Sequence, residues 1–214
     1  MSDLQTYAFN MRVEGKNLDE LAELASALRD VAEIYPAEVD GQQELAVYVS
    51  ESSPRMALLT VKNAIESSAP ELHIIRVDLD LVTVSEIAER AGVTAENARL
   101  WAGGKRRKNF PASFCLAGTS KLWAWADVFA WLEAQGIGIA ETYEEHPLPV
   151  DLVESFNGSC ARYRATWASS VPTARARLAP ISFNNPRSNK VISIFALGTT
   201  SKTAKATYHG TAAS

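Results

Sequence analysis

The chain has 214 residues, of which 47% are hydrophobic and 21% charged, and its formal net charge is −4. This composition excludes an extensively disordered chain, and no apolar run approaches the roughly 18 residues of a membrane helix. The two cysteines, Cys115 and Cys160, form neither a disulfide framework nor a metal cluster, and the N-terminus lacks the basic and apolar regions of a signal peptide, so we expect a cytoplasmic protein.

The charges are distributed unevenly along the chain. Residues 1–80 contain 6 Lys/Arg against 15 Asp/Glu, a net of −9. Residues 81–140 contain 7 against 5, a net of +2, and residues 155–214 contain 8 Lys/Arg and no acid. Such asymmetry predicts an acidic module joined to basic ones, and the basic ones are the candidates for binding nucleic acid. The acidic module would repel phosphate and therefore needs another role.

Residues 1–80 are predicted to form a β-α-β-β-α-β domain. The hydrophobic periodicity alternates between that of strands and that of helices. The expected elements are a strand at 7–13, a helix at 17–31, strands at 32–39 and 44–50, a helix from Ser53-Pro54 to Pro70, and a strand at 72–79. Asp40-Gly41 is a strong hairpin signal because both residues tolerate positive φ.

This element order is typical of the ferredoxin-like arrangement, which by itself assigns no function. The region contains no cysteine, no clustered histidine and no glycine-rich phosphate loop. We therefore interpret it as an oligomerisation or regulatory domain that would set the spacing of two copies of whatever follows it.

Residues 83–102 are predicted to form two helices joined by a tight turn. Thr83 and Glu86 form a capping box, in which each side chain satisfies a free backbone N–H of the first turn. Gly92 can adopt the left-handed conformation that ends the first helix, and Thr94 caps a second helix running to about Ala102. Two helices joined in this way form the geometry that places the second helix in a DNA major groove.

The next segment is predicted to be a basic loop, a small hairpin and a closing helix. The run Lys105-Arg106-Arg107-Lys108 follows the second helix directly. Two apolar runs, 110–116 and 122–125, flank Ala117-Gly118-Thr119-Ser120, a pattern typical of a hairpin. We interpret the tryptophans of this region as core or hairpin scaffolding rather than base-stacking platforms; they are Trp123, Trp125 and Trp131.

The order helix, turn, helix, basic loop, hairpin, helix resembles the winged helix-turn-helix of the MerR superfamily, and most closely its small excisionase-like or AlpA-like members. The resemblance is carried by the opening residues 83–88, the turn Gly92-Val93-Thr94, Phe110-Pro111, and the closing Trp125-x-x-Val128-x-x-Trp131-Leu132. It covers about 50 residues, residues 83–132, and implies binding of double-stranded DNA. MerR regulators usually carry their dimerisation and effector segments after this head, whereas here the additional domain precedes it.

The remainder of the chain has weaker signals. Residues 141–168 are predicted to be a loop followed by a helix from Val150 to about Trp167, and residues 169–214 a basic, flexible tail in which residues 191–197 could pair as an edge strand. The expected organisation is therefore an α+β protein with domains at 1–80 and 81–140, a loop and helix at 141–168, and the tail.

Positions in the helix-turn-helix predict roles in DNA binding. On the second helix, Val93, Ala98 and Trp101 should face inward and leave Ala95, Glu96 and Arg99 exposed, with Arg99 suited to pair bidentately with guanine. Thr83, Ser85 and Thr94 lie at helix N-termini, which favour phosphate. Lys105, Arg106, Arg107, Lys108 and Lys121 are predicted to contact the DNA backbone.

Three functions are compatible with these patterns. The first is a dimeric, sequence-specific transcriptional regulator, and the second is an excisionase-like accessory factor that bends DNA. The third is an adaptor, such as an antitoxin, whose acidic N-terminal domain binds a basic protein. We do not expect an enzyme, a catalytic residue, a metal or a cofactor, because the chain has no P-loop, nucleophile elbow or paired-carboxylate motif.

Overall fold

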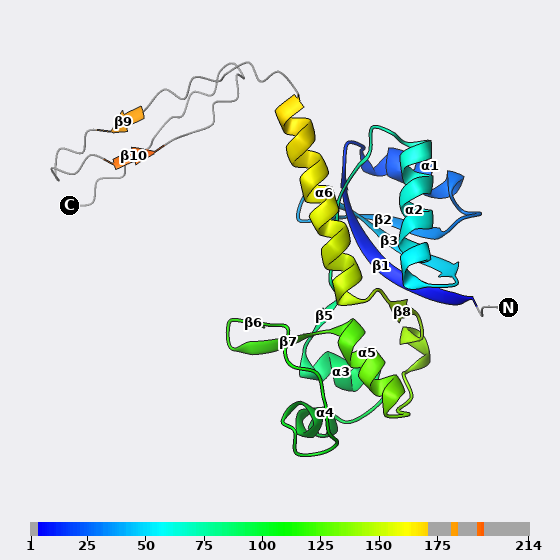
Figure 1. The fold of residues 1–214 in the computed structure, drawn as a ribbon, viewed down its shortest axis with the longest axis vertical. Helices are drawn as coiled ribbons and strands as arrows, with labels where there is room; N and C mark the ends of the chain where they lie inside the picture. Colours follow the sequence, from blue (N-terminus) through cyan, green and yellow to red (C-terminus); the bar gives the residue numbers. More distant parts are fainter. Residues whose placement is uncertain (1–3, 171–180, 184–191, 195–214) are drawn as a thin grey trace, which may run out of the picture. The chain divides into compact units, whose positions relative to one another are not determined.

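The computed structural model describes residues 4–170, 181–183 and 192–194 (Figure 1). Its class is mixed α+β, as predicted. The chain divides into two compact units, residues 1–165 and 166–214. In the second unit, two short strands pair antiparallel, β9 (Ile181–Phe183) and β10 (Ile192–Ile194). Apart from these strands and the end of the preceding helix, the predicted tail lies outside the described residues.

The first elements follow the order β-α-β-β-α-β. They are β1 (Gln5–Glu14), α1 (Leu18–Ala27), β2 (Glu33–Val39), β3 (Gln42–Glu51), α2 (Pro54–Ser68) and β4 (His73–Val77). The strands form one sheet in the order β2-β3-β1-β4, with every neighbouring pair antiparallel. Alternate residues of β1 are buried in one hydrophobic core, where they pack with side chains of α1 and α2. The buried residues of β1 are Tyr7, Phe9, Met11 and Val13.

Local signals place the turns and helix ends of this part. Asp40 and Gly41 have φ of 52° and 71°, the two positive values that a two-residue type I′ hairpin turn requires. Asn17 and Glu20 form a reciprocal capping box at the start of α1. The helix is shorter than the predicted span to Val31, because the chain turns after Leu28 so that Ala32 and Ile34 enter the core.

A second hydrophobic core organises the elements that follow. They are β5 (Leu81–Val82), α3 (Val84–Arg90), α4 (Ala95–Ala102), β6 (Cys115–Ala117), β7 (Ser120–Ala124) and α5 (Trp125–Ala134). The three strands form a sheet in the order β5-β7-β6, and α3, α4 and α5 pack around Ile87, Ala98 and Leu132, each of which is fully buried.

The segment after α5 returns to the first sheet through a short strand that the sequence did not predict. The predicted loop with a turn contains a 3-10 turn (Glu141–Tyr143), and it also contains β8 (His146–Pro147), which pairs in parallel with β1. Only β8 was not predicted, because a two-residue strand has too few positions to show a periodicity and forms only through its distant partner.

The last long helix, α6 (Val150–Ser170), covers the outer edge of β4. The side-chain amide of Asn157 donates to the carbonyl of Val77 and accepts from its N–H, both at 2.8 Å, while the Arg164 guanidinium donates to the carbonyl of Ile75 at 2.6 Å. Side chains thus occupy hydrogen-bonding positions that an additional strand would otherwise use. No helix in the described part of the chain is long and apolar enough to cross a membrane.

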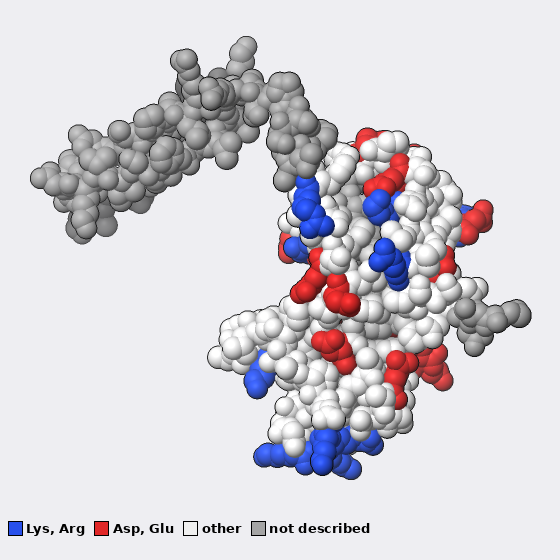
Figure 2. Space-filling view, viewed as in Figure 1, with Lys and Arg blue, Asp and Glu red and all other residues white. Residues whose placement is uncertain are grey.

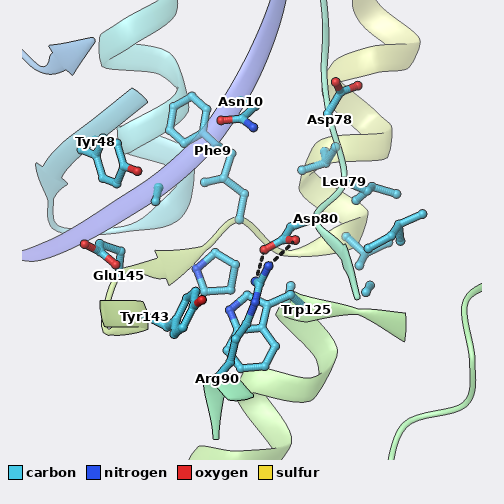
Figure 3. A pocket seen from close by; sticks show the side chains of 18 residues that line it. Phe9, Asn10, Tyr48, Asp78, Leu79, Asp80, Arg90, Trp125, Tyr143 and Glu145 are labelled. Carbon is cyan, nitrogen blue, oxygen red and sulfur yellow. Dashed lines mark hydrogen bonds and ion pairs between the residues drawn. The ribbon is translucent and has the colours of Figure 1, made fainter. Parts of the chain in front are cut away.

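A cavity of about 500 Å³ lies between the first sheet and the elements of the second core (Figure 3). Asn10 and Tyr48 line it from the sheet, Asp80 from the connection between β4 and β5, and Arg90 and Trp125 from α3 and α5. Most of its charged groups are already paired, since Arg90 binds Asp80, and Asp78 binds both Arg12 and Arg76. The cavity therefore lies at the junction between the first sheet and the elements of the second core, which the Arg90–Asp80 ion pair helps to join.

Candidate nucleic-acid interface

The predicted caps begin α3 and α4. The Thr83 hydroxyl accepts from the Glu86 N–H, and the Glu86 carboxylate accepts from the Thr83 N–H at 2.6 Å. Gly92 has φ of 61° and lets the chain reverse after α3. The Thr94 hydroxyl accepts from the Asn97 N–H and begins α4. These short-range interactions fix the entry of α4, whose Ala98 and Trp101 are buried as predicted.

The basic loop after α4 has an unusual backbone. Arg107 and Asn109 have φ of 61° and 60°, a left-handed region that side chains other than glycine rarely adopt. Such conformations cost on the order of 1 kcal/mol each and persist only where surrounding contacts enforce them. Lys105 and Arg106 both donate their backbone N–H to the carbonyl of Leu100, which holds the start of the loop against α4.

Buried tryptophans supply the contacts that hold this loop. The indole N–H of Trp131 donates to the carbonyl of Lys108 at 3.1 Å, and that of Trp123 donates to the carbonyl of Pro111 at 3.2 Å. The Phe110 ring packs edge-on against Trp131, with ring centres 4.9 Å apart. The predicted scaffolding role is supported, because Trp123, Trp125 and Trp131 are between 3% and 6% exposed. The tryptophans thus tie the C-terminal end of the basic run to the core, while the Leu100 carbonyl of α4 holds its start.

The cationic side chains around this loop fall on neighbouring elements. Arg106 donates to the side-chain oxygen of Asn97 on α4 at 2.8 Å. Arg107, Lys108 and Lys121 line one hollow of about 600 Å³ between the loop and the β6–β7 hairpin. The structure therefore brings four of the predicted backbone-contacting residues onto a surface shared by α4, the loop and the hairpin.

Positive charge predominates on the surface formed by α4, the basic loop and the hairpin, where Glu96 is the one acid of α4. From Asn97 to Ala126 the sequence contains six Lys/Arg and no Asp or Glu. Figure 2 shows Lys and Arg gathered at the end of the molecule formed by α4 and the loop, whereas most acidic residues on the same face lie toward the sheet and the junction. Such a concentration of exposed cations favours a polyanionic ligand at this end.

The other residues predicted to bind DNA differ in how exposed they are. Glu96 and Arg99 are exposed, with side chains 70% and 61% accessible, and they approach each other to 3.8 Å. Ala95 was predicted to be exposed, and this was wrong: it is half-buried and packs against the second core, because the first turn of α4 lies close to that core. Ser85 is exposed, but the nearby N–H of Thr83 is occupied by the Glu86 carboxylate, whose negative charge disfavours phosphate there.

Two further residues of this surface were not singled out from the sequence. Asn97 lies on α4 as the partner of Arg106, and Gln135 lies after α5, where its carbonyl accepts from Arg107 at 3.3 Å. Asn97 falls two positions before Arg99 and could have been found by its place on the helix. Gln135 is 28 residues from its partner and gives no local signal.

The described part of the chain does not show the pattern of a metal site. None of its His, Cys, Asp and Glu side chains form a group of three or more that could hold a metal ion. Comparison with known proteins gives no family assignment: no family model matches the chain, and no curated protein or solved structure does.

Proposed function

We propose that the chain is a sequence-specific double-stranded DNA-binding protein, and in particular a dimeric transcriptional regulator. In this proposal residues 1–80 form a ferredoxin-like oligomerisation domain and residues 81–140 a winged helix-turn-helix of the MerR type. The observation that carries it is the cationic surface spanning α4, the tethered loop and the hairpin, where Glu96 is the single acid of α4.

The rigidity of that surface supports a specific role for it. A solvated basic run needs no fixed conformation, yet here two left-handed backbone positions are held by indole hydrogen bonds and by Arg107. Strained backbone enforced by its surroundings is common at functional sites. A preorganised loop would lose less conformational entropy when its side chains bind phosphates.

The proposed roles follow from geometry and charge. α4 enters the major groove with Arg99 reading a base edge, and Glu96 either orients Arg99 or accepts from a cytosine amine. Thr94 places the N-terminus of α4 near the backbone. The cations of the loop and hairpin contact phosphates; they are Lys105, Arg106, Arg107, Lys108 and Lys121.

Binding of duplex DNA measured over a range of salt concentrations tests this proposal. Contacts to about six phosphates predict a slope near −5 for the logarithm of the binding constant against that of the salt concentration. Lys105→Ala combined with Arg106→Ala should weaken binding to all sequences and make the slope less steep by about 2.

The matched control removes the same charge from the acidic domain. Arg29 and Arg55 are both exposed on or near α1 and α2. Arg29→Ala combined with Arg55→Ala should leave the slope unchanged. If the two double variants behave alike, the cationic surface around α4 is not the DNA-binding surface.

A further inference from the structure

The β6–β7 hairpin projects from the second core. Gly118 has φ of 60° at the first central position of its two-residue turn, as in a type II′ hairpin. Every residue from 114 to 121 is exposed, so the tip contacts no other part of the described unit closely. An exposed hairpin with a tight two-residue turn is suited to enter a groove of a partner.

Two large apolar side chains are exposed on the β6 side of this hairpin. Leu116 is 65% exposed and Phe114 is 42% exposed. Large exposed hydrophobic groups that lie together indicate an interaction site more often than isolated ones do. Leu116 contributes nothing to either hydrophobic core, so its side chain has no apparent role in folding.

The pairing of the hairpin shows which way Leu116 faces. Leu116 lies directly opposite Lys121, and directly paired residues project from the same face of a sheet. Lys121 and Trp123, two positions apart on β7, both line the hollow bounded by Arg107 and Lys108. Leu116 therefore belongs to the face that carries the cations of the proposed DNA-binding surface, and a polyanion is the partner whose charge complements its surroundings.

We propose that Leu116 is a wedge that enters the minor groove of the duplex, partly unstacks one base step and kinks the DNA. This inference rests on the proposed function. Apolar wedges of this kind kink the duplex at the step they enter, away from the minor groove. Unstacking costs a few kcal/mol, and the kink offsets that cost by bringing phosphates toward the fixed cations of the loop.

The test measures DNA end-to-end distance by fluorescence transfer on duplexes with a binding site at the centre. The wild-type protein should bend the bound duplex by roughly 20–90°. Leu116→Ala should remove most of the bend while changing the affinity by less than about tenfold. Leu116→Lys adds a charge at the same exposed position and should bind at least as tightly as Leu116→Ala, again without the bend.

The control and the contrary outcomes separate this inference from the proposed function. Val39→Ala removes a similarly exposed apolar side chain from β2 and should leave the bend intact. A wild-type complex with straight DNA, or equal bending by the Leu116 and Val39 variants, would overturn the wedge while leaving DNA binding established. If the wild-type protein leaves DNA straight and Leu116→Ala abolishes an association between protein molecules, the hairpin tip binds a protein partner instead. Absence of any duplex binding would overturn both proposals.

Discussion

Arg90 on α3 forms a two-point ion pair with Asp80, which lies in the connection between β4 and β5. Its guanidinium also lies over the rings of Trp125 and Tyr143, 4.9 and 5.2 Å from their centres (Figure 3). The backbone supports the same junction, because the Trp125 N–H donates to the Asp80 carbonyl at 2.7 Å and the Ala140 N–H donates to the Arg90 carbonyl. One side chain thus joins the linker, α3, α5 and the segment that follows α5.

Replacing Arg90 should destabilise this junction. Arg90 is only 19% exposed, and Arg90→Ala removes a partly buried ion pair and two cation–π contacts. We expect a loss of about 2 kcal/mol in the free energy of unfolding, measured by urea denaturation. Arg55→Ala on the exposed face of α2 should change it by less than about 0.5 kcal/mol. Equal effects of the two changes would show that the junction does not depend on Arg90.

The tether between Trp131 and the basic loop should affect DNA binding through loop geometry. Trp131→Phe keeps an aromatic ring but removes the hydrogen bond to the Lys108 carbonyl. We expect about 1 kcal/mol lower stability and several-fold weaker DNA binding, because the left-handed positions in the loop lose support.

Trp125→Phe is the matched control for that variant. Trp125 is equally buried, but its contacts are to Arg90 and Phe129 rather than to the loop. It should cost stability while leaving the affinity of the folded protein for DNA unchanged. DNA affinities that fall equally in the two variants would show that the loss comes from general destabilisation.

The capping box of α3 should make stability depend on pH. Hydrogen bonds from the Thr83 backbone, and then its side chain, hold the pKa of Glu86 below its ordinary value. A lowered pKa means that this stabilisation is fully present above the ordinary glutamate pKa of about 4.3 and is lost as the pH falls through the folded-state pKa. Glu86→Gln should therefore lower stability at neutral pH and flatten the acid side of the stability profile.

Glu133→Gln on α5 removes an exposed carboxylate that caps no helix and serves as the control for this effect. Urea denaturation at a series of pH values measures both. A Glu86→Gln profile parallel to that of the wild type over the whole acid range would contradict the expected contribution of the capping box.

The Asn157 side chain should prove important for the edge of the first sheet. Asn157→Ala leaves both backbone groups of Val77 without their side-chain partner. We expect a loss of about 2 kcal/mol and a tendency to self-associate through the uncovered strand, measured by denaturation and light scattering. Asn63→Ala replaces an exposed asparagine on α2 and should neither lower the stability nor cause self-association. Unchanged stability and a monodisperse Asn157→Ala protein would mean that α6 does not protect this edge.

Short-range signals account for the features that the sequence predicted well. The capping box of Thr83 and Glu86, the turn at Gly92 and the Asp40-Gly41 hairpin each depend on residues within a few positions of one another. Their physical requirements, a side-chain cap or a positive φ, are therefore readable from residue type alone.

Contacts between residues far apart in the chain account for the features that the sequence did not predict. Asn157 and Val77 are 80 residues apart, and β8 exists only because β1 provides its partner. The partial burial of Ala95 depends on how closely α4 approaches the second core. Hydrophobic periodicity identifies a face to be buried but not which distant element buries it.

Selection of binding sites from a random duplex library by the purified protein is the most direct test of the account. We predict an enriched motif, with two half-sites about one helical turn apart if the protein acts as a dimer. Arg99→Ala should relax base preference at one position of each half-site, because that side chain is expected to read guanine. No enrichment over the input library, together with no duplex binding at low salt, would contradict the account and make the helix-turn-helix a packing unit.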